Sequence, residues 1–563
     1  MADPNRSRRG RRHLSSSSAS TVSSKSSSKS RSVSSRNRQR QTPRPRNDIK
    51  PQSQVATLPS DLWTQLLPFV TWRDTSAMRC VCCEWRRVTE EAKKLHPEWR
   101  STVLGPSGNG LESLELLRSN HLEWADTRFA PDMVLLSAAS KDPSPWHSGG
   151  YWEEAAAAIE EARLLPPTCT IIMMFSMNGV LGTSESDEGE GSSSAVTLSI
   201  SVAHLPDTTL AIAEFERKEL RRSQRGEELD NPFPVLEEND TPSFMLFGVN
   251  EKSAGQLVQV LGHWYPQATV VGAVSPLIDR CVPLATYSGV EPVRQDRKPR
   301  KKGRAKQHQR RRRPRGHVVY PTTMLLRLHG NVGMKSFSSC GYYPITPVIR
   351  CERADVAQEL SQVVTYDLVS TSEGSHRIME LIDPSERFAI EQEGRTLNVF
   401  SSADISALEH LLDCNANQDS LTVPYSARID RFEFVFWLQD QLMALPGRCW
   451  QEGEYGILAS HHPTRTSHAL TSALQGTKSS LNQPEFGAFI VAGALNEVED
   501  IVHSQQISKV FTDVFREVQL GGCIASSSVG PTAFPGGVQL PVRTTTQVQT
   551  HTTCGAIFCH KVG

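Results

Sequence analysis

Two segments far apart in the chain share one order of elements, and this repetition limits the folds open to the chain. Residues 244–274 run FMLFGVN, SAGQLVQVLGHW and ATVVGAV, which is an apolar run, an amphipathic stretch and a second apolar run. Residues 486–530 repeat this order and end in LGGCIASSSVG. A strand, a helix and a returning strand predict a crossover unit in which helices cover a sheet. Two such units predict a mixed α/β body with two similarly wound lobes.

Other elements are predicted from short apolar runs, which favour strands, and from periodic runs, which favour helices. The expected strands lie at residues 169–175, 196–202, 210–215, 324–329, 387–392, 397–400 and 432–438. Helices are expected at 403–412 and in WEEAAAAIEEARLL, which Pro166 and Pro167 end. The acidic stretch SESDEGEG at 184–191 is typical of a loop.

Ahead of this body, residues 58–88 predict a helical hairpin. Leu58, Leu62 and Leu66 recur every four positions and form one stripe of a helix that Pro59 opens and Pro68 closes. A second helix is expected with Asp74 as its N-cap, and its apolar face would carry Ala77, Met78, Val81, Trp85 and Val88. Two helices within roughly 40 residues cannot bury both stripes, so apolar surface should be offered to a partner. The alternative is an ordinary hairpin packed on the domain behind it.

This hairpin resembles an F-box. The resemblance rests on the opening Leu58-Pro59 and the pair Asp61-Leu62, then on Phe69-Val70, Asp74 and the closing Val81-Cys82-Cys83-Glu84-Trp85-Arg86. It departs from the F-box pattern at Pro68 and at Ala77, where a larger leucine is common. In that family the motif binds the Skp-type adaptor of cullin-RING ubiquitin ligases. The resemblance implies adaptor contacts through Leu58, Pro59, Leu62, Leu66, Val81 and Trp85.

Charge is strongly segregated along the chain, although lysine plus arginine and aspartate plus glutamate number 61 each. Residues 1–50 carry fourteen basic residues against two acidic ones, and residues 294–315 carry thirteen against Asp296 alone. The rest of the chain therefore holds 34 basic and 58 acidic residues. The Ser/Arg-rich tail lacks the apolar residues that order a segment and is predicted to be disordered, and the second run is predicted to be an inserted loop.

The basic runs suggest nuclear addresses. The candidates are Lys298, Arg300, Lys301 and Lys302, followed by Arg310, Arg311, Arg312 and Arg313. Neither run contains an aromatic residue on which bases could stack, so nucleic acid is disfavoured as a partner. The alternative is a solvated insertion. We expect the protein in nucleus and cytoplasm, since no apolar run of about 18 residues and no secretory signal precede the body.

The body resembles the two parts of a FIST module, a signal-transduction domain that bacteria use to sense small ligands. The resemblance rests on ATVVGA at 268–273, SCGYYPITP at 339–347, LGGCIASSSVGPTAFPGG and THTTCGAIF. The chain departs from the family at Ala525-Ser526-Ser527-Ser528, where Asn-Gly-Glu is usual, so a ligand contact through that glutamate is not carried over. The expected parts are a disordered tail at 1–54, the F-box at 55–100, a helical linker at 101–166, the N-terminal FIST lobe at 167–293, a basic insertion at 294–317 and the C-terminal FIST lobe at 318–563.

Enzyme motifs are poorly matched. HGNVGMKS at 329–336 places Met334 where a phosphate loop needs glycine, and His461-His462 has no ligand-spaced partner, which favours a surface loop. Cys340 and Cys554 have no local base, and the twelve cysteines show neither zinc-site nor disulfide spacing. We therefore expect a non-catalytic protein without a cofactor.

The F-box resemblance thus implies a ubiquitin-ligase subunit that holds a Skp-type adaptor, and through it cullin and RING protein, while its body holds a protein substrate. Two other functions stay open. In a ligand sensor, turns at Gly272, Gly341 and Gly521-Gly522 would surround a metabolite pocket. A nucleic-acid-associated factor would bind through the Arg/Ser tail, with an affinity that falls steeply as salt rises.

Overall fold

The computed structural model describes residues 62, 66, 70–81 and 83–561, apart from internal gaps. These gaps are 126, 148–149, 162–164, 167, 177–178, 183–194, 217, 221–228, 234–240, 276–280, 289–316, 341, 353, 357–362, 367, 394–396, 403–404, 407, 410–411, 413–430, 439–441, 447–451, 462, 494–496, 532–545 and 550–551. The predicted tail at 1–54 and residues 294–316 of the predicted insertion lie outside the described residues. Everything described belongs to one unit, Leu58–Gly563.

The described chain has a mixed α/β fold, as predicted, and its first sheet contains strands that the sequence did not indicate. The order is β1 (Glu98–Ser107), β5 (Val196–His204), β2 (Met133–Ser140), β3 (Thr170–Ser176), β9 (Leu284–Ser288) and β10 (His317–Val319). Strands β2 and β3 are parallel, with η2 (Ser144–Trp146) and α6 (Gly150–Glu161) between them. Helices α4 (Gly110–Ser119) and α5 (His121–Trp124) follow β1.

The expected helical linker at 101–166 is therefore wrong. Strand β2 has the sequence MVLLSAAS, and all of its residues are buried. A parallel strand covered on both faces is typically such a continuous apolar run, without the alternation that marks a half-exposed strand. The helix predicted within WEEAAAAIEEARLL is confirmed as α6.

The second and third sheets contain the two predicted strand–helix–strand units. The second sheet has the order β26 (Thr546–Gln549), β25 (Ser527–Pro531), β8 (Thr269–Val274), β7 (Ser243–Gly248), β11 (Thr323–Gly330) and β6 (Thr208–Phe215). The third has the order β12 (Val332–Cys340), β27 (Thr552–His560), β23 (Glu485–Gly493), β24 (Leu520–Ala525) and β4 (Val180–Gly182). Helix α8 (Glu251–Trp264) joins the parallel pair β7–β8, and α13 (Glu497–Val514) joins the parallel pair β23–β24.

With β2–α6–β3, the described residues contain three units of this order, one in each of the first three sheets. In each sheet the parallel pair lies between two antiparallel neighbours: β5 and β9, β11 and β25, and β27 and β4. Residues 329–336 are not a phosphate loop: they run from the end of β11 in the second sheet, where Gly330 has φ 135°, through Asn331 into β12 of the third sheet, and no helix follows.

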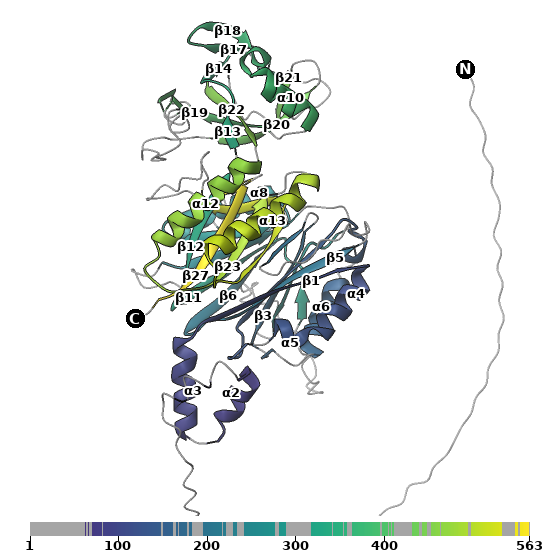
Figure 1. The fold of residues 1–563 in the computed structure, drawn as a ribbon, viewed down its shortest axis with the longest axis vertical. Coiled ribbons are helices and arrows are strands. Elements are labelled where there is room, and N and C mark those ends of the chain that lie inside the picture. Colours follow the sequence, from purple (N-terminus) through teal and green to yellow (C-terminus); the bar gives the residue numbers. More distant parts are fainter. Residues whose placement is uncertain are drawn as a thin grey trace, which may run out of the picture. The chain divides into compact units, whose positions relative to one another are not determined.

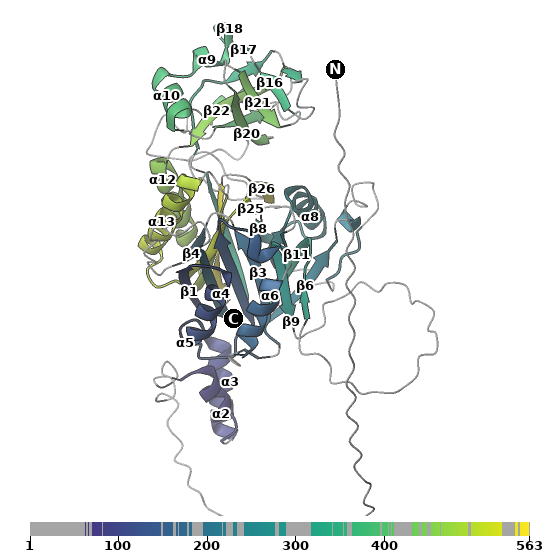
Figure 2. The ribbon, with the colours of Figure 1, turned by 90° about the vertical axis from the view of Figure 1, so that its right-hand side faces the viewer.

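The three sheets share one core. Alternate residues of each parallel unit point into it, for example Leu135 from β2, Phe247 from β7 and Phe489 from β23. The residues between them face outward, where Leu136 packs with the α4–α6 side, Leu246 with α8, and Ile490 with α12 (Pro463–Ser479) and α13. Figure 1 shows α12 and α13 along the strands of the third sheet, and Figure 2 shows α8 beside β8 and β11. Period-two alternation in these strands thus separates an inner core from three outer, helix-covered layers.

The sheets are interleaved along the chain, so the expected lobes do not match the observed sheets. Strands β25 and β26, which follow residue 520, extend the sheet of β7 and β8. Conversely, β4, from residues 180–182, closes the sheet of β23 and β24. The boundary expected at residue 318 also fails, because β11 lies beyond it in sequence but pairs with β6 and β7.

A fourth sheet comes from residues 342–461. Its order is β15 (Ala354–Val356), β16 (Val363–Tyr366), β21 (Leu442–Pro446), β20 (Arg431–Leu438), β19 (Leu397–Ser402), β22 (Tyr455–His461), β14 (Ile349–Cys351), β17 (Leu368–Thr371) and β18 (Gly374–Arg377), with β13 (Tyr342–Pro344) also paired to β22. It has a core of its own, around Ile349, Val399 and Leu458.

Two predictions in this region are corrected. Residues 387–392 belong to helix α10 (Pro384–Glu393), which follows α9 (Ile378–Leu381), so the strand expected there is wrong. Asp383 explains the helix, since its carboxylate accepts a hydrogen bond from the Ser385 amide at 2.8 Å, as a cap at a helix start does. His461 is the last residue of β22 and not part of a surface loop, while His462 lies outside the described residues.

Candidate docking surface on the N-terminal helices

The N-terminal helical segment begins with residues 62 and 66, which are both helical, and continues with α2 (Trp72–Met78) and α3 (Cys83–Leu95). Asp74 is not the N-cap that the sequence predicted. Thr71 is the N-cap of α2, and Asp74 completes a capping box, with its Oδ2 atom 3.1 Å from the Thr71 amide nitrogen. Such a box satisfies two of the amides that a helix start leaves without partners.

The single second helix expected over residues 74–88 is also corrected, because it is broken after Met78. The Cys80 amide donates to the Ala77 carbonyl at 2.9 Å, and the Val81 amide donates to the Met78 carbonyl at 3.0 Å. These three-residue spacings tighten and end the helix. The chain then reverses, and an ion pair between Arg79 and Glu90 joins the turn to α3.

Three of the predicted contact residues expose large apolar side chains. Leu62 is 41% exposed, Leu66 42% and Val81 55%. Trp85, on the first turns of α3, is partly buried. The predicted contacts Leu58 and Pro59 lie outside the described residues. The structure adds Leu95, the last residue of α3, which is 63% exposed and which the sequence pattern did not mark. Burying a leucine stabilises a complex by about 1.5–3 kcal/mol, so this surface is able to contribute strongly to binding.

The other side of these helices is fixed to the body by specific contacts. The Thr75 hydroxyl, which is buried, donates to the Arg128 carbonyl at 2.9 Å. Ala92 of α3 packs on Phe129, next to Val70. The hydrogen bond and the small apolar cluster hold α2 and α3 on the body, while Leu62, Leu66 and Leu95 remain exposed.

A buried carboxylate supports this junction. Glu98, the first residue of β1, accepts a hydrogen bond from the Arg128 amide at 2.7 Å. Its other oxygen lies 3.6 Å from Nε of Arg128 and 3.4 Å from Nε of Arg100. Two guanidinium groups and an amide compensate the cost of burying this charge. The loop that receives Thr75 is therefore held in one conformation.

The candidate nuclear-address residues, Lys298, Arg300, Lys301, Lys302, Arg310, Arg311, Arg312 and Arg313, lie outside the described residues and stay a prediction.

The glycines expected to line a ligand pocket do not form turns. Gly272 lies inside β8, and Gly521 and Gly522 lie inside β24, while Gly341 lies outside the described residues. A Cβ atom on Gly272 would lie 1.8 Å from the Leu246 carbonyl oxygen, and one on Gly522 would lie 1.9 Å from the Ile490 carbonyl oxygen. These glycines permit close approach of paired strands, which is a packing role.

Serine hydroxyls join the carboxyl ends of the three parallel units to one another. Ser275, after β8, donates to the Phe175 carbonyl of β3 at 2.5 Å, and Ser526, after β24, donates to the Val274 carbonyl of β8 at 2.7 Å. Ser176, at the end of β3, donates to the Ile524 carbonyl of β24 and so closes the ring. Ligands of open α/β sheets bind outside such strand ends. In this chain the hydroxyls of Ser176, Ser275 and Ser526 at these strand ends make hydrogen bonds within the protein.

The cysteine candidate Cys554 is fully buried, and so is Cys523. Burial raises the pKa of each of these thiols to about 12, against a smaller opposite effect of a hydrogen bond with Ser528 for Cys554 and with Ser137 for Cys523. The thiolate is the reactive form, so both burial and the raised pKa disfavour reaction of these thiols. Cys80 and Cys83, beside Val81 on the docking surface, are exposed free thiols.

Iodoacetamide at pH 7 is therefore expected to label Cys80 and Cys83 at least about a hundredfold faster than Cys523 and Cys554. Mass spectrometry of peptides after timed quenching measures the rates, and labelling in urea supplies the control in which all four thiols react. Native labelling of Cys554 as fast as that of Cys80 would contradict the burial described here.

No protein-family model matches the chain, and a search of curated proteins finds no significant match. Within the part of the chain that the structure describes, histidine, cysteine and carboxylate side chains form no cluster able to hold a metal ion. No helix of that part has the length and apolar character needed to cross a bilayer.

Proposed function

We propose that this chain is the substrate-recognition subunit of a Skp-cullin-F-box ubiquitin ligase. The observation that carries the proposal is the N-terminal helical segment, which offers Leu62, Leu66 and Val81 to solvent while its opposite side is fixed to the body. A monomeric protein rarely keeps several large apolar side chains exposed on one short segment unless they serve an interaction. The F-box resemblance of residues 58–86 supports a Skp-type adaptor as the partner.

The chain itself performs no bond chemistry in this proposal. The N-terminal helices bind the adaptor, which links to cullin and RING protein, and the α/β body binds a target protein. Holding the target near the ubiquitin-conjugating enzyme replaces a bimolecular encounter by an intramolecular one, which raises the effective concentration. The expected order of an F-box followed by both FIST parts resembles that of F-box only protein 22, and the outcome that we propose is target degradation in nucleus and cytoplasm.

The test is co-precipitation of a Skp-type adaptor with the full chain and with a Leu62→Asp, Leu66→Asp double variant. Each aspartate removes an apolar contact and places a charge at the interface, so binding is expected to weaken by more than about a hundredfold. A Leu58→Ala, Pro59→Ala variant is expected to weaken binding as well. Titration by calorimetry or interferometry gives the dissociation constants.

Leu111→Asp is the matched control, because Leu111 is an exposed leucine on α4 and does not belong to the docking surface. It should bind like the wild type. The proposal fails if the wild type shows no binding at micromolar concentration, or if Leu111→Asp weakens binding as much as the double variant does.

A further inference from the structure

The last turn of α3 contains a main-chain acceptor that the helix cannot satisfy. In an α-helix the carbonyl of residue i accepts from the amide of residue i+4. For Lys93 that residue is Pro97, which has no N–H group. The preceding carbonyl, that of Ala92, still receives the His96 amide at 3.1 Å. The Lys93 carbonyl is therefore the point at which the helix needs a donor from elsewhere.

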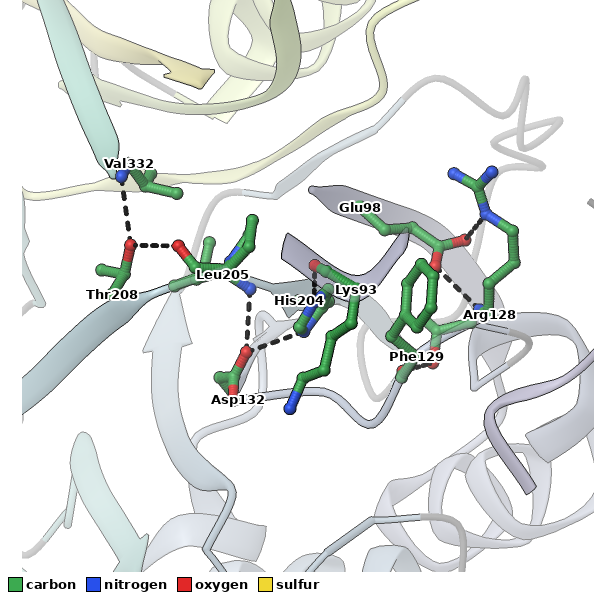
Figure 3. Close-up of polar contacts among 11 residues, drawn as sticks. Lys93, Glu98, Arg128, Phe129, Asp132, His204, Leu205, Thr208 and Val332 are labelled. Atoms are coloured by element: carbon green, nitrogen blue, oxygen red, sulfur yellow. Dashed lines mark hydrogen bonds and ion pairs between the residues drawn. The ribbon is translucent and has the colours of Figure 1, made fainter. Parts of the chain in front are cut away.

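His204, the last residue of β5, supplies this donor. Its Nε2 atom lies 3.1 Å from the Lys93 carbonyl oxygen, and its Nδ1 atom lies 2.9 Å from Oδ2 of Asp132 (Figure 3). The side chain is 1% exposed. Both ring nitrogens thus face oxygen acceptors, one from the body and one from α3.

The orientation of the ring is set by the body. Asp132 Oδ2 accepts a second hydrogen bond, from the Leu205 amide at 2.8 Å. The main chain of Asp132 bonds to both neighbouring strands, donating to the Ala203 carbonyl at 2.8 Å and accepting from the Thr170 amide at 3.0 Å. The pairing of Asp132 with these strands therefore fixes the position of its carboxylate, and the contact with this carboxylate fixes the orientation of the His204 ring.

The side chains around the His204 ring have contacts of their own. The Phe129 ring packs beside it, tilted by 44° at a centroid separation of 5.2 Å. The nearby carboxylate of Glu98 contacts Arg128, as Figure 3 shows, and also Arg100. Burial, then Arg128 and His560, lower the pKa of His96 below its ordinary value, which disfavours its charged form. Asp132 is thus the charged group bonded to His204.

We propose that His204 and Asp132 are positioning residues that fix the direction of the adaptor-binding helices relative to the substrate-binding body. This inference rests on the proposed function. The pair joins α3 to the sheet across 111 residues of sequence and touches neither adaptor nor target. Without it, the adaptor still binds, but the angle between ligase and target varies, so ubiquitin transfer becomes slower and less selective for particular lysines.

The first experiment measures the joint itself, by hydrogen–deuterium exchange of peptides covering residues 91–98 in the free full-length chain. His204→Leu removes both ring nitrogens and is expected to raise exchange there about tenfold, the effect of losing a hydrogen bond to a charged group. His204→Gln keeps one N–H group for the Lys93 carbonyl and is expected to restore most of the protection. Unchanged exchange in His204→Leu overturns the inference, and so does a Gln variant as unprotected as the Leu variant.

The second experiment uses the complete ligase reconstituted with a Skp-type adaptor. Self-ubiquitination is followed by quantitative mass spectrometry of the modified lysines. His204→Leu is expected to keep the adaptor affinity within about twofold, while the rate at saturating adaptor falls at least about fivefold and modification spreads over more lysines. A wild-type rate and lysine pattern in His204→Leu overturns the positioning role.

The two experiments separate the inference from the proposed function. If the wild type binds no adaptor, the ligase assignment fails, whereas the exchange result still decides whether His204 holds α3. If His204→Leu does not fold, as judged by circular dichroism, Asp132→Asn replaces it, since it removes the charge that holds the ring and keeps an oxygen acceptor. Exchange in residues 91–98 is then expected to rise about threefold, and wild-type exchange overturns the inference.

Discussion

Replacing Gly272 by alanine is expected to prevent the chain from folding. The added Cβ atom would lie 1.8 Å from the carbonyl oxygen and 2.9 Å from the amide nitrogen of Leu246, within the parallel pair β7–β8. Both contacts are with main chain, so no side chain is able to move aside. The strands would have to separate in the middle of the second sheet. The expected loss exceeds about 4 kcal/mol, which is a large part of the stability of a typical domain.

The yield of soluble protein and urea unfolding followed by circular dichroism measure this effect. Gly262→Ala is the control, because Gly262 lies in helix α8 with no heavy atom within 4 Å of the added carbon. That substitution is expected to stabilise the chain by about 0.5–1 kcal/mol, since alanine favours the helical state. A soluble Gly272→Ala variant with wild-type unfolding would show that β7 and β8 are not paired as described.

Truncation of Phe489 to alanine is expected to cost about 3–5 kcal/mol. Phe489 is buried in the core that the three sheets share, and its ring meets Phe247 of the second sheet edge-on, with centroids 6.0 Å apart. The neighbouring side chains come from different sheets and cannot all close on the space left behind. The loss therefore combines the transfer free energy of the ring with the cost of a cavity.

Differential scanning calorimetry of Phe489→Ala should show a lower melting temperature in a single transition that includes all three sheets. Phe388→Ala is the comparison, because Phe388 is an exposed phenylalanine on α10 and its loss is expected to change stability by less than about 0.5 kcal/mol. If Phe489→Ala melts like Phe388→Ala, the three sheets do not share a core at this residue.

Much of the fold could be predicted from the local order of apolar and polar residues. The units β7–α8–β8 and β23–α13–β24 were predicted because an apolar run, an amphipathic stretch and a second apolar run follow one another, with a polar residue such as Asn250, the N-cap of α8, between them. The third unit was missed although β2 is, like β7, an apolar run that is buried on both faces. The pairing of β25 with β8 joins residues about 250 positions apart, and no spacing in the sequence marks such a contact.

The candidate docking surface was predicted in part. Leu62 and Leu66 follow from helical spacing and from the resemblance, whereas Val81 follows from the resemblance alone, since the helix expected to carry it ends at Met78; all three are exposed. Leu95 was missed because it lies beyond the stretch that carries the resemblance. One local feature of the sequence indicated that the Lys93 carbonyl lacks a helical donor, namely Pro97 four residues later. The donor, His204, comes from a distant strand, so only the tertiary structure identifies it.

The place of β27 has a consequence for synthesis of the protein. This strand, Thr552–His560, lies between β12 and β23, both of which are made earlier. While the ribosome is still at work, β12 and β23 each present an open edge of unpaired amides and carbonyls, which other chains are able to join. We expect nascent chains to require shielding by chaperones until residue 560 has emerged from the exit tunnel, and chains cut short before β27 to aggregate or to be degraded.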